Sequence, residues 1–244
     1  MNIFEQTLNN ISGGQVLDVA TSRGGFVERL KEHLQNYTSI IGIDVDAQIL
    51  EIARDNFDDE NIRFMLMDAG RLEFENGRFD TVTASASLHH LPDIPQALAE
   101  INRVLKPGGT FIFIEMHRDA QTEAQRTLVQ MHHWAADVDT MRGVYHNKTF
   151  TRQELVDFIE SMRLQNVVMH DFLETDSDPN DEESIKHCEN VIDKVLQRAI
   201  GFPEYESLKA RSKELRKRLH DSGVHWEPAL FIIGQKPFTN KTIF

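Results

Sequence analysis

Three aspartates, Asp18, Asp44 and Asp68, each end an apolar stretch that is typical of a buried strand. In an open parallel sheet the ligand crevice lies outside the carboxyl ends of the strands, where the strand order reverses. Asp44 follows the first strand-to-helix loop by about twenty residues. A carboxylate at this spacing along the chain typically accepts hydrogen bonds from both hydroxyls of a ribose. Asp68 would meet an adenine edge. One strand-end aspartate alone is more often a helix cap or a turn residue, so the prediction depends on all three together.

The loop after the first predicted strand has fewer glycines than a nucleotide-binding loop usually has. The stretch VLDVATSRGGF, residues 16–26, reads as a strand, a polar corner and the start of a helix. Ala20 and Ser22 occupy corner positions where glycine would allow positive φ and close backbone contacts. If φ at Ser22 is positive, we expect a strain of about 1–2 kcal/mol. The G-x-G-x-x-G spacing of dehydrogenases is absent, which disfavours a dinucleotide-dependent oxidoreductase.

Apolar runs alternate with helical patterns through the first half of the chain, which predicts a parallel sheet covered on both faces. The predicted strands span residues 16–20, 39–44, 62–68, 79–86, 110–115, 166–172 and 230–235. The predicted helices span residues 25–35, 47–57, 94–105 and 119–138, and a turn is expected at 106–109. Thr151 and Glu154 have the spacing of a capping box, which predicts a further helix start.

Composition limits the function classes. A chain of 244 residues, 40% hydrophobic, can bury a full core, and it has no N-terminal apolar region or long apolar run. We therefore expect a soluble protein with no membrane partner. The formal net charge of −13 argues against a general affinity for nucleic acid. The single cysteine, Cys188, excludes an internal disulfide and fits a cytoplasmic location.

Five segments of the chain resemble the class I S-adenosylmethionine (SAM)-dependent methyltransferases, in the small-molecule branch related to the ubiquinone and menaquinone methyltransferases. They are VLDVATSRGGF, IIGIDVDAQILEIAR, FMLMDAGRLEFENGRFDTV, SLHHLPD and ALAEINRVLKPGGTFIFIE. The resemblance covers roughly residues 15–116, and the RVLKPGG turn is its most specific part. It implies an α/β, Rossmann-like, doubly wound sheet of seven strands, mostly parallel, with the last strand antiparallel.

The resemblance also implies which residues bind the cofactor, S-adenosyl-L-methionine. Carried over position by position, they are Asp18, Ala20, Ser22, Gly24, Asp44, Val45, Asp68, Ala69, Ser85 and Ala86. In that assignment Asp44 binds the ribose, Asp68 and Ala69 lie on the adenine side, and Ser85 and Ala86 form a wall of the pocket.

Residues for the methyl acceptor are harder to read. Methyl transfer from a sulfonium is an in-line displacement that depends mainly on positioning, although a phenol or enol acceptor can require one base. The candidate bases or acceptor contacts come in three pairs: His89 and His90, Glu115 and His117, and Tyr145 and His146. The alternative for the His89–His90 pair is a packed histidine bonded to the backbone, and for His146 it is an ordinary loop position.

The sequence predicts no metal site. The adjacent His132 and His133 point to different helix faces, and no H-x-x-x-H spacing or cysteine partner accompanies them. The stretch DSDPNDEES imitates a calcium loop, but Asp181 and His187 stand where such a loop needs glycine and glutamate. We interpret it as a solvated loop that caps the next helix.

A helical insertion is predicted between the last two strands. Two sets of residues there have helical spacing: Ile185, Cys188, Ile192, Val195 and Ala199, and then Leu208, Ser212, Leu215 and Leu219. We expect residues 1–175 and 224–244 to form the SAM-binding domain. Residues 176–223 would form a lid or a homodimer contact, or only a solvated face.

The most favoured function is a SAM-dependent methyltransferase with a small-molecule acceptor. The alternatives are a methyltransferase for a protein or RNA target and a non-catalytic SAM-binding module.

Overall fold

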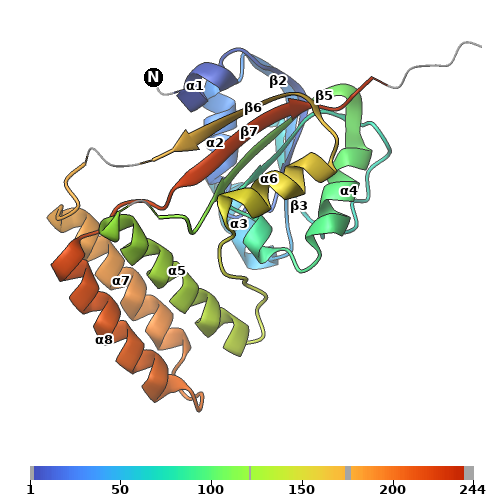
Figure 1. Ribbon diagram of the computed structural model, residues 1–244. Helices are drawn as coiled ribbons and strands as arrows, with labels where there is room; N and C mark the ends of the chain where they lie inside the picture. The colour runs from blue at the N-terminus through green and yellow to red at the C-terminus, as the bar shows by residue number, and fades with distance from the viewer. Residues whose placement is uncertain (1–2, 121, 174–176, 239–244) are drawn as a thin grey trace, which may run out of the picture. The chain divides into compact units, whose positions relative to one another are not determined.

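The computed structural model describes residues 3–120, 122–173 and 177–238 (Figure 1). Internal contacts divide the chain into two compact units. The first comprises residues 1–115, 156–170 and 231–244, and the second comprises residues 116–155 and 171–230. Every helix in the described ranges is too short or too polar to cross a lipid bilayer.

A seven-stranded sheet in the order β3-β2-β1-β4-β5-β7-β6 organises the first unit. Its strands are β1 (Ser12–Val19), β2 (Asn36–Asp44), β3 (Ile62–Leu66), β4 (Phe79–Ser85), β5 (Leu105–Met116), β6 (Gln165–Phe172) and β7 (Ala229–Gln235). Pairing is parallel from β3 through β5. Strand β7 runs antiparallel to β5, because Lys236 bonds to Gly109 whereas Pro228 bonds to His117. The predicted sheet, with its antiparallel last strand, is confirmed.

The strand order reverses between β1 and β4. From β1 the chain continues to β2 and β3 on one side, whereas β4 and β5 lie on the other. The register pairs Val19 of β1 with Ile43 of β2 and with Ala84 of β4, so the three carboxyl ends lie next to one another. This reversal is the place where an open α/β sheet forms its ligand crevice.

Five helices alternate with these strands: α1 (Ile3–Leu8), α2 (Gly25–His33), α3 (Ala47–Asn56), α4 (Ile94–Val104) and α6 (Arg152–Ser161). Aspartates begin two of them, since the Asp46 side chain accepts from the Gln48 and Ile49 amides and Asp93 accepts from Gln96. The capping box predicted at α6 is present: the Glu154 amide donates to Thr151 Oγ1, and the Thr151 amide donates to Glu154 Oε2. The short helix α1 was not predicted.

The predicted turn at 106–109 lies inside β5 as an irregularity of the sheet. Phe79 pairs with Leu105 and Thr81 with Thr110, so four residues of β5 stand opposite Asp80 alone. Gly108 has φ of 79°, and a Cβ there would collide with the Phe238 ring. The structure therefore confirms the need for glycine, while the backbone stays hydrogen-bonded to residue 236.

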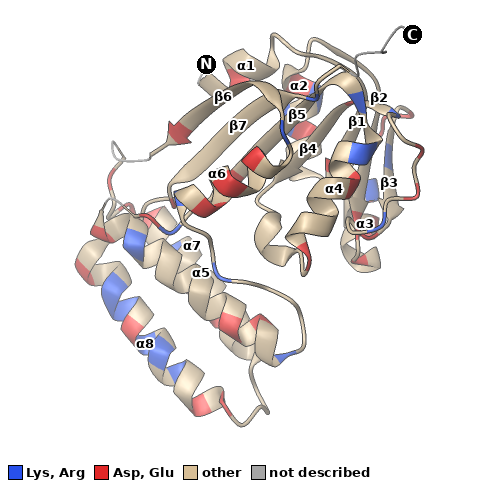
Figure 2. Cartoon of the chain, turned by 45° about the vertical axis from the view of Figure 1, so that its right-hand side comes forward, with Lys and Arg blue, Asp and Glu red and all other residues tan. Residues whose placement is uncertain are grey.

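Three helices form the second unit: α5 (Glu123–Met141), α7 (Glu182–Arg198) and α8 (Tyr205–Ser222). Figure 2 shows Lys and Arg along α8. The hydrophobic core of this unit joins all three helices. It consists of Met131, Trp134, Val138, Cys188, Ile192, Val195, Ala199, Leu208, Leu215, Leu219 and Val224. Trp134 Nε1 also donates to the Leu208 carbonyl at 3.2 Å. The helical spacing predicted for α7 and α8 is confirmed, since all of those residues except Ser212 belong to this core or pack against it, and Ser212 is buried.

The unit boundary differs from the one expected from the sequence. In the described part of the predicted insertion, residues 177–223, the helices are α7 and α8, whereas α5 packs with both of them in the same unit. The apolar face of α5, with Trp134 at 1% exposure, has its partners there. Helix α5 also begins at residue 123 rather than 119, because Thr122 and Gln125 form its capping box.

Candidate functional site

The loop between β1 and α2 has three left-handed residues in alternation. Ala20 has φ of 54°, Ser22 has φ of 51° and Gly24 has φ of 82°. The Thr21 amide donates to the Ile43 carbonyl at 2.8 Å, and the Ser22 amide donates to Asp44 Oδ2 at 2.9 Å. These two hydrogen bonds attach the loop to the carboxyl end of β2. They hold Ala20 and Ser22 in a left-handed conformation that costs about 1–2 kcal/mol for each residue.

Asp18 is a buried carboxyl group directly below this loop. Its side chain is 1% exposed, and Oδ1 accepts from Thr83 Oγ1 at 2.5 Å. Among the described residues, nothing hydrogen-bonds to Oδ2. Burial raises the pKa of Asp18 to about 6, although the hydrogen bond from the Thr83 hydroxyl lowers it and the charge of Asp44 adds to the rise. Asp18 therefore offers a buried acceptor that a cationic ligand group would satisfy.

Asp44 and Asp68 lie at the same edge. Asp44 Oδ1 accepts from the Asp46 amide at 3.1 Å, and its backbone carbonyl accepts from the Met67 amide at 2.9 Å. One residue further, Asp68 is exposed, and its Oδ1 accepts from the Gly70 amide at 2.8 Å. Each of the two carboxylates thus accepts a hydrogen bond that stabilises its loop. Each also has oxygen lone pairs that can accept from hydroxyl or amino donors.

The other predicted cofactor positions lie at these strand ends as well. Val45 is 70% exposed and Ala69 is 5% exposed. Ser85 ends β4, and Ala86 follows with φ of 46° and an amide that donates to the Ile114 carbonyl at 2.8 Å. The carboxyl ends of β1 to β4 therefore bring the predicted set together along one edge of the sheet.

A buried histidine–glutamate pair follows β4. The short 3₁₀ turn Leu88–His90 places His89 Nδ1 3.2 Å from Glu115 Oε1, and the Leu88 amide donates to Glu115 Oε2 at 2.8 Å. Both side chains are at most 2% exposed. A carboxylate in that position holds the ring proton on Nδ1 and leaves Nε2 as the basic nitrogen. His90 is exposed, with its ring 4.2 Å from the His89 ring.

His146 belongs to the second unit. Its Nδ1 lies 3.0 Å from Asp139 Oδ2, and its Nε2 lies 3.1 Å from His132 Nε2. Tyr145 beside it is 46% exposed. The sequence proposed His146 without these partners, because neither the spacing to residue 132 nor that to residue 139 follows a known pattern.

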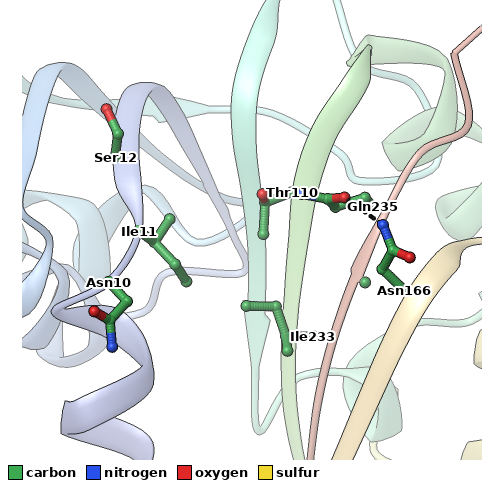
Figure 3. Close-up of a pocket in the computed structure, with 8 residues that line it drawn as sticks. Asn10, Ile11, Ser12, Thr110, Asn166, Ile233 and Gln235 are labelled. Carbon is green, nitrogen blue, oxygen red and sulfur yellow. Dashed lines mark hydrogen bonds between the residues drawn. The ribbon is translucent and has the colours of Figure 1, made fainter.

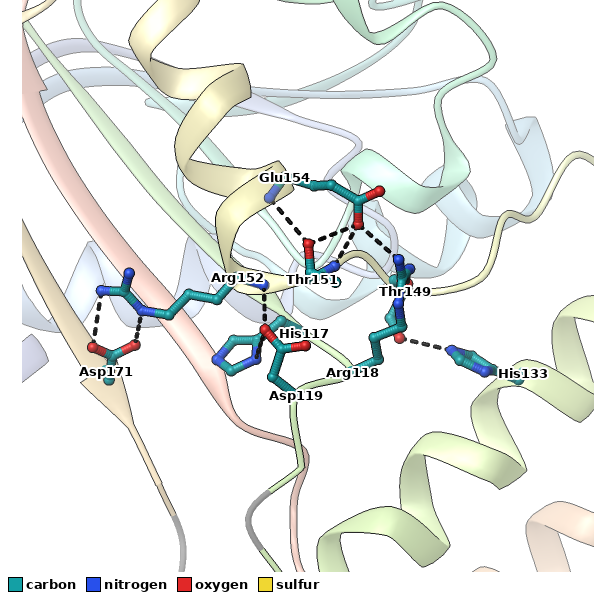
Figure 4. A network of polar contacts seen from close by, with 9 residues as sticks. All are labelled: His117, Arg118, Asp119, His133, Thr149, Thr151, Arg152, Glu154 and Asp171. Carbon is teal, nitrogen blue, oxygen red and sulfur yellow. Dashed lines mark hydrogen bonds and ion pairs between the residues drawn. The ribbon is translucent and has the colours of Figure 1, made fainter.

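His117 lies in a polar network of the second unit that sequence reasoning did not single out (Figure 4). Its ring is 2% exposed, 3.9 Å from Asp119, and burial lowers its pKa. Around it are two ion pairs, Arg152–Asp171 at 2.6 Å and Arg118–Glu154 at 2.9 Å. These ion pairs anchor the start of α6, so a structural role is sufficient to explain the network.

A hollow of about 430 Å³ lies at the opposite edge of the sheet (Figure 3). Its lining includes Ile11 and Ser12 at the start of β1 and Asn166 near the start of β6, and Asn166 Nδ2 donates to Gln235 Oε1 at 2.9 Å. These are amino-terminal ends of parallel strands, where α/β sheets do not usually bind ligands, and the lining carries no charge. We do not assign the chemistry to it.

Comparison with known proteins gives both a sequence and a fold relationship. Residues 17–113 match the methyltransferase domain family. The demethylmenaquinone methyltransferase of Lactococcus lactis is 37% identical over 111 residues, which are 44% of this chain and 44% of that protein. The chain therefore aligns with less than half the length of this relative.

Two solved structures resemble the whole chain. The YcgJ protein of Bacillus subtilis has a TM-score of 0.59 at 18% identity, covering 96% of this chain and 97% of that one. Phosphoethanolamine N-methyltransferase 2 of Haemonchus contortus, in complex with SAM, has a TM-score of 0.58 at 16% identity, covering 96% and 52%. Residues 17–113 are thus similar to the methyltransferase domain family, and the chain as a whole has the fold of these two structures.

Proposed function

We propose that this chain binds SAM at the carboxyl edge of β1 to β4 and transfers its methyl group to a small-molecule acceptor. The observation that carries the proposal is the buried Asp18 carboxyl, with one unsatisfied oxygen among the described residues, beneath a left-handed loop that is bonded to Asp44. The match of residues 17–113 to the methyltransferase domain family, and the similarity of that region to demethylmenaquinone methyltransferases, support it.

The residues at this edge fit the parts of the cofactor. Asp18 Oδ2 suits the ammonium of the methionyl group, because an unpaired buried oxygen gains most from a cationic donor. Asp44 would accept from the ribose hydroxyls, and Asp68 with Ala69 would lie on the adenine side.

The chain's own contribution to the reaction is positioning and one base. When bound, the cofactor supplies an electrophilic methyl group that transfers by in-line displacement. We assign the role of general base to His89, whose Nε2 would take the proton from a hydroxyl acceptor. Glu115 is then a positioning residue, because it holds the Nδ1 proton of His89.

Calorimetric titration with SAM and with S-adenosylhomocysteine tests cofactor binding. Asp44→Ala should weaken SAM binding by about 2–3 kcal/mol through the loss of charge-assisted hydrogen bonds. Asp58→Ala is the matched control, since it removes an exposed aspartate away from the edge. An unchanged affinity in Asp44→Ala would remove Asp44 from the site.

Turnover with labelled SAM and a panel of phenolic, quinol and amine acceptors separates an enzyme from a binding module. Binding without methylation of any acceptor in such a panel, or of protein or RNA, favours the non-catalytic alternative. If His89 acts as the base, His89→Gln lowers kcat and removes the acidic limb of the pH profile, while SAM affinity is kept. The lid or dimer role of residues 176–223 stays a prediction, which sedimentation velocity addresses for the dimer.

A further inference from the structure

Two histidines of the second unit face each other through the same ring atom. His132 comes from α5 and His146 from the segment that follows it, and their Nε2 atoms are 3.1 Å apart. The rings meet edge to face, with centroids 5.1 Å apart and an interplanar angle of 86°. Their side chains are only 17% and 8% exposed.

Each histidine has a carboxylate behind it. Asp139 Oδ2 lies 3.0 Å from His146 Nδ1, and Glu227 Oε1 lies 3.8 Å from His132 Nδ1. Asp139 is held in turn by Arg198, at 2.8 Å through its other oxygen.

The carboxylates determine where the ring protons lie. Asp139 holds the proton of His146 on Nδ1, because a carboxylate can only accept. Glu227 favours the same tautomer of His132, since the opposite tautomer would turn a ring lone pair toward a carboxylate. With both ring protons on Nδ1, the two Nε2 lone pairs face each other at 3.1 Å, a separation that suits a cation bound between them.

We propose that His132 and His146 bind a divalent transition-metal ion, zinc or a related imidazole-binding metal, through their Nε2 atoms. With metal–nitrogen distances of about 2.0–2.1 Å, a nitrogen separation of 3.1 Å gives an angle of about 95–102° at the metal. That angle lies between octahedral and tetrahedral geometry. Paired carboxylates on the distal ring nitrogens are the usual outer support of metal-binding histidines.

The sequence predicted no metal site because His132 has no metal-ligating partner at a known spacing along the chain. The fold supplies such a partner. Residues 132 and 133 do point to different surroundings, since His133 Nε2 lies 2.8 Å from Thr149 Oγ1. The partner of His132 comes instead from beyond the helix end, where Gly143 has φ of 80° and the Val144 amide donates to the Asp139 carbonyl. This reversal of the chain brings residue 146 back to residue 132.

Titration of the tag-free, chelator-treated full chain with Zn²⁺ and Co²⁺ tests the site, by calorimetry and by the visible absorption of bound Co²⁺. We expect one ion per chain and a thermal midpoint that rises with metal. His132→Gln and His146→Gln should each weaken binding by at least about tenfold, and Asp139→Asn by about 10–100-fold. His133→Gln is the matched control, on the same helix and half-buried, and should bind as the wild type does.

Two results would overturn the proposal: no saturable binding at one ion per chain in the wild type, or binding that both glutamine variants retain. Because a variant could fail to fold, each is first checked by circular dichroism, and the wild-type cobalt spectrum alone remains decisive. The readout does not involve SAM or methyl transfer, so failure here leaves the proposed function untouched, and the reverse also holds.

Discussion

Asp18→Asn should stabilise the first unit at neutral pH, although it removes a charged group from the proposed cofactor site. The Asp18 carboxyl is fully buried, and Asn keeps its shape and the oxygen that accepts from Thr83. Burial raises the pKa from 3.8 to about 6, so the folded chain favours the protonated acid. At about 1.4 kcal/mol per pKa unit, ionising this group in the folded state costs about 3 kcal/mol, an upper bound for the gain.

The sign of this effect fixes its pH window. Between about pH 4 and pH 6 the folded state binds more protons than the unfolded state, so wild-type stability falls as pH rises through that range. Asn at position 18 does not titrate, so the stability of the variant does not fall in this way as pH rises. The variant and the wild type should therefore be equally stable near pH 4 and should differ most at pH 7–8.

The assay has to report on the first unit. Both tryptophans, Trp134 and Trp226, lie in the second unit, so tryptophan fluorescence is unsuitable. Amide hydrogen exchange of β1 and β4, followed by mass spectrometry across pH with exchange-rate correction, gives local opening free energies. Parallel profiles for Asp18→Asn and wild type from pH 4 to pH 8 would refute the reasoning.

Asp80→Asn supplies a control of opposite sign on the neighbouring strand, β4. Lys106 and the Gln15 amide hold the pKa of Asp80 below its usual value, although burial is the largest single influence and acts to raise it. Ionised Asp80 therefore contributes to the free energy of unfolding above the pKa of the unfolded state, and this contribution is lost as pH falls through the folded pKa. Asp80→Asn should be less stable than wild type at neutral pH and should converge with it in acid.

Three further substitutions test the loop and the helical unit by urea denaturation. Ser22→Gly should stabilise the chain by about 0.5–1 kcal/mol, because relief of left-handed strain exceeds the added chain entropy. Gly24→Ala should destabilise it by more than about 1–2 kcal/mol, since a Cβ there would also lie 2.5 Å from the Phe57 ring. Trp134→Ala should cost the second unit about 3–5 kcal/mol, followed through the exposed Trp226; an unchanged midpoint would contradict its place in the core.

The sequence was sufficient for the sheet because its strands are continuous apolar runs. Ile40, Ile41 and Ile43 in β2 are all at most 7% exposed, as burial on both faces requires. Boundaries were less accurate where local hydrogen bonds decide them, as at α5, whose start depends on the Thr122–Gln125 capping box. The grouping of α5 with α7 and α8 depends on tertiary packing, which helical spacing alone does not specify.

The site could be predicted only as far as chain topology determines it. Strand ends that meet at one edge bring Asp18, Asp44 and Asp68 together, and their order along the chain is enough to expect this. The hydroxyl of Thr83 against Asp18 depends on the register of β4 against β1. The pairing of His132 with His146 depends on a loop reversal, which no residue spacing encodes.

Backbone strain supports the assignment of the carboxyl edge independently of the carboxylates. Of the described non-glycine residues, five have positive φ, and three of them, Ala20, Ser22 and Ala86, lie at this edge on loops after two different strands. Left-handed residues persist where surrounding contacts over-determine them, and such strain concentrates at functional sites. Here the bonds from Thr21 to Ile43 and from Ser22 to Asp44 supply that restraint. The loop thus reaches a glycine-like conformation with few glycines, because hydrogen bonds to β2 offset a strain of a few kcal/mol. Asp44 is therefore required for the shape of the loop as well as for the hydroxyl groups that we propose it binds.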